Sequence, residues 1–283
     1  MLKIDFHIHT ISTIKDDEFE FDINDLNKYI NEMKLDCIAI TNHNIFDKKQ
    51  FQTISSCVNA KVFPGLEVDI ENSHLLIIGD ISDADDLEKS SSELEKFIID
   101  ASSSVTFEEF ITIFPNYEKY LLIPHYKKHP RMHSSTIKKF NGLIKCGEVP
   151  NAKKFSIIIK EDKSLVPVVF SDYRIGSKEP IPSRYTYVNC TNDGFTNIKL
   201  AIEDKSKVSV TKNNNINEIE YLPDGATISN RLNIIVGTRT SGKTYNLEKI
   251  KETFDNDNCL YVPQFSLIGS AESFKESIFI LYF

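Results

Sequence analysis

Apolar runs that end in histidine, carboxylate or hydroxyl side chains recur along the first two-thirds of the chain. The polar segments that close these runs are 5–10 (DFHIHT), 41–44 (TNHN), 64–67 (PGLE), 124–125 (PH) and 171–174 (SDYR). Each run has the length of a buried strand, and residues at the ends of parallel strands converge at one mouth of an α/β barrel. The sequence therefore predicts a β/α barrel with a polynuclear metal centre at that mouth.

The expected strands and helices alternate in the manner of βαβ units. Strands are predicted at 2–9, 35–41, 61–68, 74–81, 120–125, 143–149 and 166–171. Helices are predicted at 23–33 with Asp22 as N-cap, at about 83–100, and at 106–114, which opens with a Thr-Phe-Glu-Glu capping signal. The expected fold is an α/β protein built on a distorted seven-stranded, TIM-like β/α barrel.

Composition and charge narrow the class of protein. The 283 residues carry a formal net charge of -8, so no global basic field attracts polyanions, and the basic stretch at 126–131 is expected to be a solvated face. The cysteines form no C-x-x-C pair and are expected to be reduced and to serve packing: Cys37, Cys57, Cys146, Cys190 and Cys259. No apolar run approaches the roughly 18 residues of a membrane span, so we expect a cytoplasmic chain without a membrane partner.

Two histidines at the end of the first predicted strand are the first candidate metal ligands. His7 and His9 alternate along the strand, so both side chains point to one face and can chelate a single ion. Glu67 and Asp172, at the ends of other strands, complete a set of two histidines and two carboxylates. Packing alone explains such a set poorly, because a buried unpaired carboxylate is costly.

A second motif lies near the carboxyl end of the sequence. Residues 237–244 (GTRTSGKT) fit the pattern G-x-x-x-x-G-K-[ST], between a predicted strand at 232–236 and a predicted helix at 245–253. In such a loop the backbone N–H groups from Gly237 to Gly242 cradle phosphates, Lys243 meets the β- and γ-phosphates, and Thr244 meets Mg²⁺. ATP with Mg²⁺ is the expected ligand, and a chance match on a glycine-rich turn is the alternative.

The nucleotide-binding part is predicted to be incomplete. Residues 1–205 are expected to form the barrel, 206–217 a linker, and 218–283 a partial P-loop segment. No apolar run ending in Asp follows Lys243 as a Walker B strand should. Residues 259–264 resemble a second strand that ends in Gln264. We expect either a truncated reading frame, or completion of the ATPase by a second copy in a homodimer or by another partner.

In order along the chain, the motifs resemble those of the PHP (polymerase and histidinol phosphatase) domain. The matching motifs are Asp5-x-His7-x-His9-Thr10, the Thr-x-His at 41–43, Pro64-Gly-x-Glu67, His74-Leu-Leu, Pro124-His125 and Ser171-Asp172. The resemblance covers about residues 1–205. A PHP barrel followed by a P-loop and a Tyr-x-Pro-Gln segment further resembles the TrlF-type PHP proteins, in which an SMC/ABC-like ATPase follows the barrel.

The resemblance implies a set of ligands for two divalent ions, Mn, Zn or Fe. The first ion would be held by His7, His9, Glu67 and Asp172. The second would share Glu67, which would bridge the two ions, and would also take His74 and His125. A third ion of the family uses an early Asp, here Asp16 or Asp17, then His43, and a last histidine whose place is taken here by Arg174, while Asn42 replaces the usual Asp.

Arg174 and His43 therefore receive separate predictions. An arginine cannot ligate a cation, so the third metal site is expected to be weak or empty. Arg174 is expected to contact a substrate phosphate instead. His43 is a candidate general acid for the leaving oxygen, or else a structural histidine bonded to a carboxylate. Gln264 resembles the glutamine that senses the γ-phosphate in ABC ATPases.

Three classes of function follow from the sequence. The first is a metal-dependent phosphoesterase, a nuclease or nucleotide phosphatase in DNA repair or defence, that is coupled to ATP binding. The second is a phosphatase of the histidinol-phosphatase type that acts on a small metabolite. The third is a non-catalytic PHP scaffold with ATP-dependent partner binding. The ATPase segment favours a nucleic acid or nucleotide as the phosphoester substrate, and the retained ligand set disfavours the scaffold.

Overall fold

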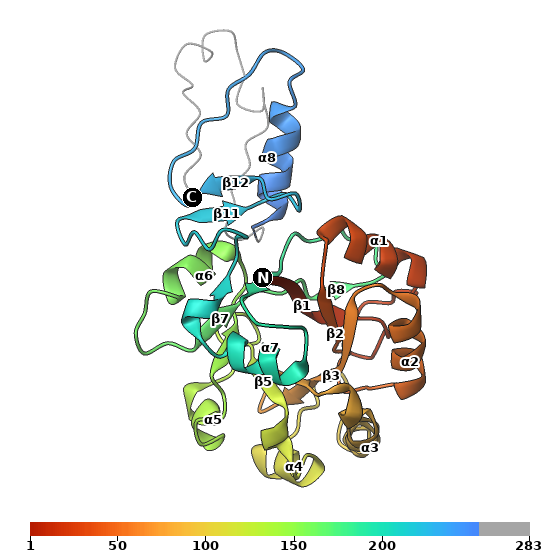
Figure 1. Ribbon diagram of the computed structural model, residues 1–283. Coiled ribbons are helices and arrows are strands. Elements are labelled where there is room, and N and C mark those ends of the chain that lie inside the picture. Colours follow the sequence, from red (N-terminus) through yellow and green to blue (C-terminus); the bar gives the residue numbers. More distant parts are fainter. Residues whose placement is uncertain (255–283) are drawn as a thin grey trace, which may run out of the picture.

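The computed structural model describes residues 1–254, coloured from red to blue in Figure 1. The predictions for Cys259, Gln264 and the strand at 259–264 fall outside the described residues. Among the helices of the described part, none has the length and apolar character needed to cross a membrane.

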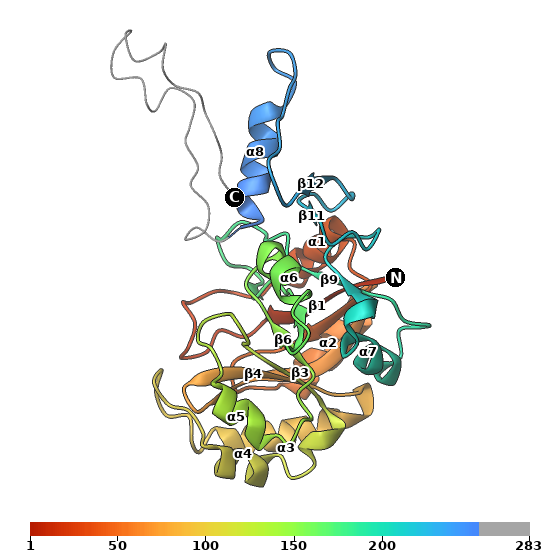
Figure 2. The same ribbon diagram turned by 90° about the vertical axis from the view of Figure 1, so that its left-hand side faces the viewer.

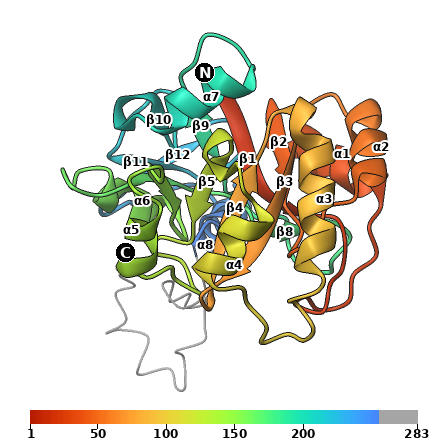
Figure 3. The same cartoon turned by 90° about the horizontal axis from the view of Figure 1, so that it is seen from below.

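A curled, half-barrel sheet forms the centre of the molecule (Figure 3). Its strand order is β10-β9-β1-β2-β3-β4-β5, and β8 pairs with β1. The bounds are β1 Leu2–His9, β2 Cys37–Ile40, β3 Lys61–Ile70, β4 Ser73–Ile78, β5 Leu121–Pro124, β8 Tyr173–Arg174, β9 Thr186–Val188 and β10 Val208–Ser209. A separate parallel pair, β6 (Cys146–Glu148) and β7 (Val166–Val168), continues the wall from β5 through a bridge between His125 and Glu148.

The sheet is mixed, which corrects the expected succession of parallel βαβ units. Strands β1, β2 and β3 are parallel, but β4 runs antiparallel to both β3 and β5, and β9 runs antiparallel to β1. The reason is a tight turn: Glu71 (φ 47°) and Asn72 (φ 58°) both adopt the left-handed conformation that a two-residue hairpin turn requires. His74 therefore lies at the start of an antiparallel strand rather than at the end of a parallel one.

Helices pack on the outside of this sheet (Figures 1 and 2). Their bounds are α1 Ile23–Met33, α2 Lys48–Cys57, α3 Ala84–Leu94, α4 Phe107–Ile113, α5 Ser134–Lys139, α6 Ala152–Ile158 and α7 Phe195–Ile202, with 3-10 turns at Ile81–Asp83, Tyr117–Lys119 and Lys205–Lys207. Helix α8 (Lys243–Glu252) lies apart from the sheet, in the segment after the barrel. The caps predicted for two helices are confirmed: Asp22 accepts the N–H of Asn24, and Thr106 forms a capping box with Glu109. The predicted acidic helix is shorter than expected, because α3 ends at Leu94.

Two apolar clusters fill the two sides of the sheet. Along β2, Ile38 and Ile40 pack with α1 to α4, whereas Cys37 and Ala39 pack on the opposite side with β5 to β7 and α7. This alternation follows from the two-residue period of a strand that is covered on both faces. The buried strands thus place the polar residues at their ends around the mouth of the half-barrel.

The segment after the barrel forms a small hairpin and a helix. Strands β11 (Glu218–Glu220) and β12 (Thr227–Ser229) pair antiparallel, and Ile219 and Ile228 are buried in the same cluster as the barrel residues. The strand predicted at 232–236 is absent from this part of the structure: no described strand pairs with it, and Leu232, Ile234 and Val236 are 68%, 78% and 83% exposed. Strand β10 lies within the predicted linker and pairs with β9.

A buried ion pair ties this hairpin to the barrel. Glu220 Oε1 lies 3.5 Å from the Lys3 ammonium and accepts the hydroxyls of Tyr185 and Tyr187, each at 2.9 Å. The Lys3 Nζ atom also stands 3.6 Å from the centre of the Tyr185 ring. Because burial outweighs the attraction of Glu220, the pKa of Lys3 is lowered to about 8.

Candidate metal centre

The base of the site is a buried carboxylate on β1. Asp5 accepts hydrogen bonds from the Tyr29 hydroxyl at 2.6 Å and from the Ser171 backbone N–H at 3.1 Å, and it also accepts the Ser171 hydroxyl. Burial raises the pKa of Asp5 to about 6, although these donors oppose the shift. Through its hydrogen bonds with Ser171, Asp5 thus links the segment of Asp172 to β1, the strand of His7 and His9.

Glu67 stands between two groups of histidines. Its Oε2 atom lies 3.0 Å from His7 Nε2 and 3.4 Å from His9 Nε2. Its Oε1 atom lies 2.6 Å from His74 Nδ1 and 3.2 Å from His125 Nε2. Glu67 is 1% exposed, and its two oxygens face different donor sets. This is the arrangement that a bridging carboxylate requires.

Asp172 completes the first donor set. Its Oδ1 atom lies 3.1 Å from His9 Nε2 and 3.3 Å from His7 Nε2, and ligand atoms of His7, His9, Glu67 and Asp172 all lie within 4.8 Å of one another. The backbone at Asp172 is left-handed, with φ 55°, a conformation that a non-glycine residue adopts at a cost. That backbone turns the carboxylate from the strand end toward the two histidines.

The β3–β4 hairpin and the residue after β5 supply the second donor set. Atoms of Glu67, His74 and His125 also lie within 4.8 Å of one another. His74 sits directly across from Asp69 in the hairpin, with 3.1 Å between Nε2 and Asp69 Oδ1. A carboxylate at this distance fixes the ring and leaves Nδ1 toward Glu67.

The donor atoms suit divalent metal ions. Imidazole nitrogens and carboxylate oxygens are the ligands that Zn²⁺, Mn²⁺ and Fe²⁺ take in proteins. Nε2 of His125, which faces Glu67 in the second donor set, is buried without a hydrogen bond of good geometry. A buried unsatisfied polar atom calls for an explanation. A cation that takes up the lone pair of this nitrogen supplies one.

The sequence did not predict three residues of the centre, which are Asp69, Glu148 and Lys128. Glu148, which ends β6, lies 2.9 Å from His7 Nδ1 through Oε2. Lys128 lies 2.7 Å from Glu148 Oε1 and 3.0 Å from Asp172 Oδ2, with its side chain 12% exposed. The expectation that the basic stretch at 126–131 forms a solvated face is therefore wrong for Lys128. Glu148 carried the same signal as the others, a carboxylate at the end of an apolar run.

Arg174 and Asp16 meet beside the first donor set. Arg174 Nε donates to Asp16 Oδ1 at 2.8 Å, and Nη1 donates at 2.9 Å to both the carbonyl and the Oδ1 of Asp172. Of the two aspartates considered at this position, Asp16 is the one that groups with His9 and His43. Asn42 is turned away from this group, because its Oδ1 accepts the N–H groups of Thr10 and Ile11 at 2.6 and 2.9 Å.

The charges of the centre are strongly coupled. Burial would lower the pKa of His7, but Asp172 and Glu67 outweigh it and raise the pKa to about 10. The same competition raises the pKa of His74 to about 9. For His43 burial prevails and lowers the pKa to about 4. The role of general acid stays a prediction for His43.

The P-loop residues lie on the surface at the start of α8. Lys243 Nζ donates to the carbonyls of Gly237 and Thr238 at 2.8 and 2.6 Å. Gly242 caps the helix in a left-handed conformation, with φ 83°, and Thr244 follows in the first turn. The positive φ favours glycine at position 242, whereas a Cβ atom at Gly237 would meet the Ser241 hydroxyl at 2.3 Å, which that side chain can relieve by rotation.

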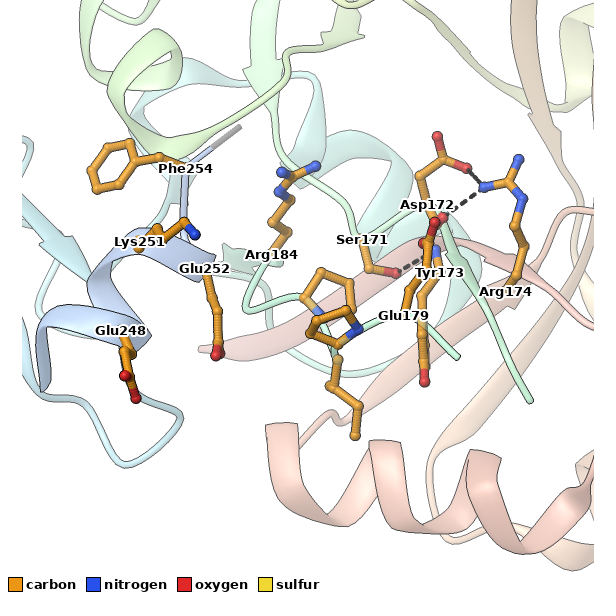
Figure 4. A pocket seen from close by; sticks show the side chains of 13 residues that line it. Ser171, Asp172, Tyr173, Arg174, Glu179, Arg184, Glu248, Lys251, Glu252 and Phe254 are labelled. Carbon is orange, nitrogen blue, oxygen red and sulfur yellow. Dashed lines mark hydrogen bonds and ion pairs between the residues drawn. The ribbon is translucent and has the colours of Figure 1, made fainter. Parts of the chain in front are cut away.

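Three cavities adjoin the centre. One of about 360 Å³ is lined by His43, Asp69, His74, His125 and Arg174 among others. A second, of about 710 Å³, lies between the 171–184 segment and the end of α8 (Figure 4). A third, of about 870 Å³, is lined by residues 14–20 and 176–179. Arg174 lines all three cavities.

Comparisons with known proteins give a distant structural likeness. No protein-family model and no curated protein matches the chain. A similar solved structure is a two-domain protein from Bacteroides vulgatus, described as containing a predicted PHP-like metal-dependent phosphoesterase, with 15% identity and a TM-score of 0.41 over 73% of this chain and 63% of that one. Another, described as a candidate metal-dependent phosphoesterase from Bifidobacterium adolescentis, has 13% identity and a TM-score of 0.40 over 62% of this chain and 90% of that one. A likeness of this degree carries no argument about activity.

Proposed function

We propose that the chain is a metal-dependent phosphoesterase of the PHP type that uses two divalent ions. The observation that carries the proposal is the split of Glu67, with Oε2 toward His7 and His9 and Oε1 toward His74 and His125. Two ions held by these donors would activate a water for attack and offset the charge that develops on phosphorus. The metal-ligand roles of these residues are part of the proposal.

The chain's own residues orient the donors. When His7 Nδ1 donates its proton to Glu148, its Nε2 lone pair is left pointing at Glu67 and Asp172. Lys128 holds Glu148 and Asp172 at once, which offsets part of the negative charge of the two carboxylates. A phosphoryl group in the cavity of about 360 Å³ would lie beside His43 and Arg174.

The proposal is tested by metal content and hydrolysis together. The purified chain, loaded with Mn²⁺, is expected to hydrolyse p-nitrophenyl phosphate or its bis ester. Glu67→Gln is expected to lose both the bound metal and the hydrolysis, because one substitution removes the anionic bridge shared by the two donor sets. Glu71→Gln is the matched control, since Glu71 lies at the hairpin turn and contacts Lys139 and Thr136 instead of the centre.

Bound metal and hydrolysis together decide whether the proposed function holds. A wild-type chain that binds no metal, or hydrolysis that survives in Glu67→Gln, would refute the two-ion phosphoesterase. Loss of activity in Glu71→Gln would show that the assay reports folding rather than the centre.

The extent of the cavities favours a substrate larger than a small metabolite. Arg174 lines the cavities of about 710 and 870 Å³ as well as the one over the proposed metal ligands. We therefore favour a nucleotide or single-stranded nucleic acid over a small sugar or amino-alcohol phosphate. Faster hydrolysis of p-nitrophenyl phosphate than of thymidine 5′-p-nitrophenyl phosphate and a short single-stranded oligonucleotide would argue against this choice.

We further propose that the loop from Gly237 to Thr244 binds ATP with Mg²⁺. The start of α8 at Lys243 and the left-handed Gly242 before it support this part. A bound phosphate would have to draw the Lys243 ammonium away from the carbonyls of Gly237 and Thr238. Lys243→Ala is expected to weaken binding of a fluorescent ATP analogue, whereas Lys249→Ala, on the same helix, is expected to leave it unchanged.

A further inference from the structure

The Arg174 side chain lies within a group of metal-ligating residues. Ligand atoms of His9, Asp16 and His43 lie within 4.8 Å of one another. Arg174 is the direct neighbour of His9 across the β1–β8 pair. Its Nε atom is 2.8 Å from Asp16 Oδ1, and its Nη2 atom is 3.4 Å from His43 Nε2. The guanidinium therefore contacts two of the three members of this group.

The partner of Arg174 is a buried charge. The Asp16 side chain is 0% exposed, so its carboxylate needs a cation or several hydrogen-bond donors close by. A guanidinium keeps its charge at any ordinary pH and has five N–H donors but no lone pair to offer a metal. Arg174 also donates two hydrogen bonds to Asp172, the carboxylate of the first donor set, and Figure 4 shows this contact.

The contact with His43 sets the tautomer of that ring. Because arginine can only donate, His43 Nε2 must accept from Nη2. The proton of the neutral ring then lies on Nδ1, which faces Glu67 Oε2 at 3.2 Å. In this state His43 Nε2 has no proton to give to a leaving group.

We propose that the Arg174 guanidinium is a built-in cation that takes the place of a third divalent ion among His9, Asp16 and His43. The inference rests on the proposed two-ion function and refines it. It replaces the expectation that Arg174 serves mainly to bind substrate phosphate, because Nε and Nη1 are already donated to Asp16 and Asp172. The centre then holds two ions and one permanent side-chain charge.

Counting ions tests this proposal without an activity assay. The full chain is loaded with excess Mn²⁺, freed of loosely bound metal by gel filtration, and measured by inductively coupled plasma mass spectrometry. We expect about two ions per wild-type chain and per Arg174→Lys chain, because lysine retains the cation. Arg174→His is expected to bind about three, since a histidine beside His9 adds a ligand to the group and removes the competing charge.

A double variant serves as the matched control. Arg174→His combined with Asp16→Asn is expected to return the count to about two, because the carboxylate of the third group is gone. Three ions in the wild-type chain, or two in a folded Arg174→His chain, would overturn the proposal. The wild-type count alone still decides if Arg174→His does not fold. If the proposed two-ion function itself were wrong, the result would be different: the wild-type chain would bind no ion and hydrolyse nothing.

Discussion

The barrel mouth and the segment after it carry equally recognisable motifs, but they differ in how the chain surrounds them. The candidate metal centre gathers buried and half-buried side chains from β1, β3, β4 and β6 and from the segments that follow β2, β5 and β7. The loop at 237–242 is exposed, and the apolar residues before it have no strand partner in the described part of the chain. Packing within the barrel thus holds the side chains of the first region, whereas those of the loop face solvent.

The largest expected effect concerns the buried ion pair of Lys3 and Glu220, which ties the β11–β12 hairpin to the barrel. Glu220→Ala leaves the Lys3 ammonium buried without its partner, so the free energy of unfolding should fall by about 3–5 kcal/mol. Glu218→Ala, on the same strand but outside the buried pair, is the control and should change it by less than about 0.5 kcal/mol. Urea unfolding of both variants measures the difference. An unchanged midpoint for Glu220→Ala would mean that the hairpin does not stabilise the barrel.

A smaller effect is expected inside the centre itself. Glu148→Gln keeps the shape of the side chain but weakens the hold on His7 Nδ1 and Lys128, so Mn²⁺ affinity or hydrolysis should drop by about 10- to 100-fold. Steady-state kinetics across a Mn²⁺ titration would separate the two. Glu161→Gln, an exposed carboxylate, provides the comparison. A drop of equal size in both variants would contradict the assignment of Glu148.

The lowered pKa of Lys3 makes the free energy of unfolding depend on pH. Below pH 8 the lysine is charged in both states, and folding bears the full cost of burying that charge. Between pH 8 and the unfolded value near 10.4 only the unfolded state keeps the proton, so stability should rise with pH by up to about 1.4 kcal/mol per unit. Lys3→Met should lack this rise, and urea midpoints at pH 7.5 and 9.5 compare the two chains. Parallel behaviour would contradict the lowered pKa.

The smallest expected effect is on the rate at which individual cysteines react with a thiol label, which reports on local exposure. Cys57 is exposed, whereas Cys37 is buried and its pKa is raised to about 12, mainly by burial. Cys57→Ser should therefore remove one rapidly labelled thiol at pH 8, and Cys37→Ser should remove none. Mass spectrometry of the labelled chain checks both. Rapid labelling of Cys37 would show that β2 opens readily.

Local signals in the sequence predicted the parts of the fold that depend on neighbouring residues. The bounds of β1 and α1 and the caps at Asp22 and Thr106 agree with the structure. The hairpin between β3 and β4 was missed, because its turn residues Glu71 and Asn72 are not the usual glycine-containing pair.

Long-range contacts account for the rest of what was missed in the centre. Most of the predicted ligands lie where an apolar run ends, a pattern visible in one dimension, whereas His74 lies at the start of β4. Lys128 could not be found in this way, since its neighbours Glu148 and Asp172 come from distant segments and only the curled sheet brings them within 3.0 Å. The strand expected at 232–236 had local propensity but has no described strand beside it.

The two-residue length of the turn at Glu71 and Asn72 also sets the register of His74 on β4. Because strand side chains alternate, one residue inserted there would rotate His74 to the far face of β4 and separate it from Glu67 and Asp69. A glycine inserted after Asp224, in the exposed turn between β11 and β12, leaves that register alone. A metal count on both insertions would show the contrast, with loss expected only at the hairpin. Natural chains of this kind should thus vary in length elsewhere and keep this turn at two residues.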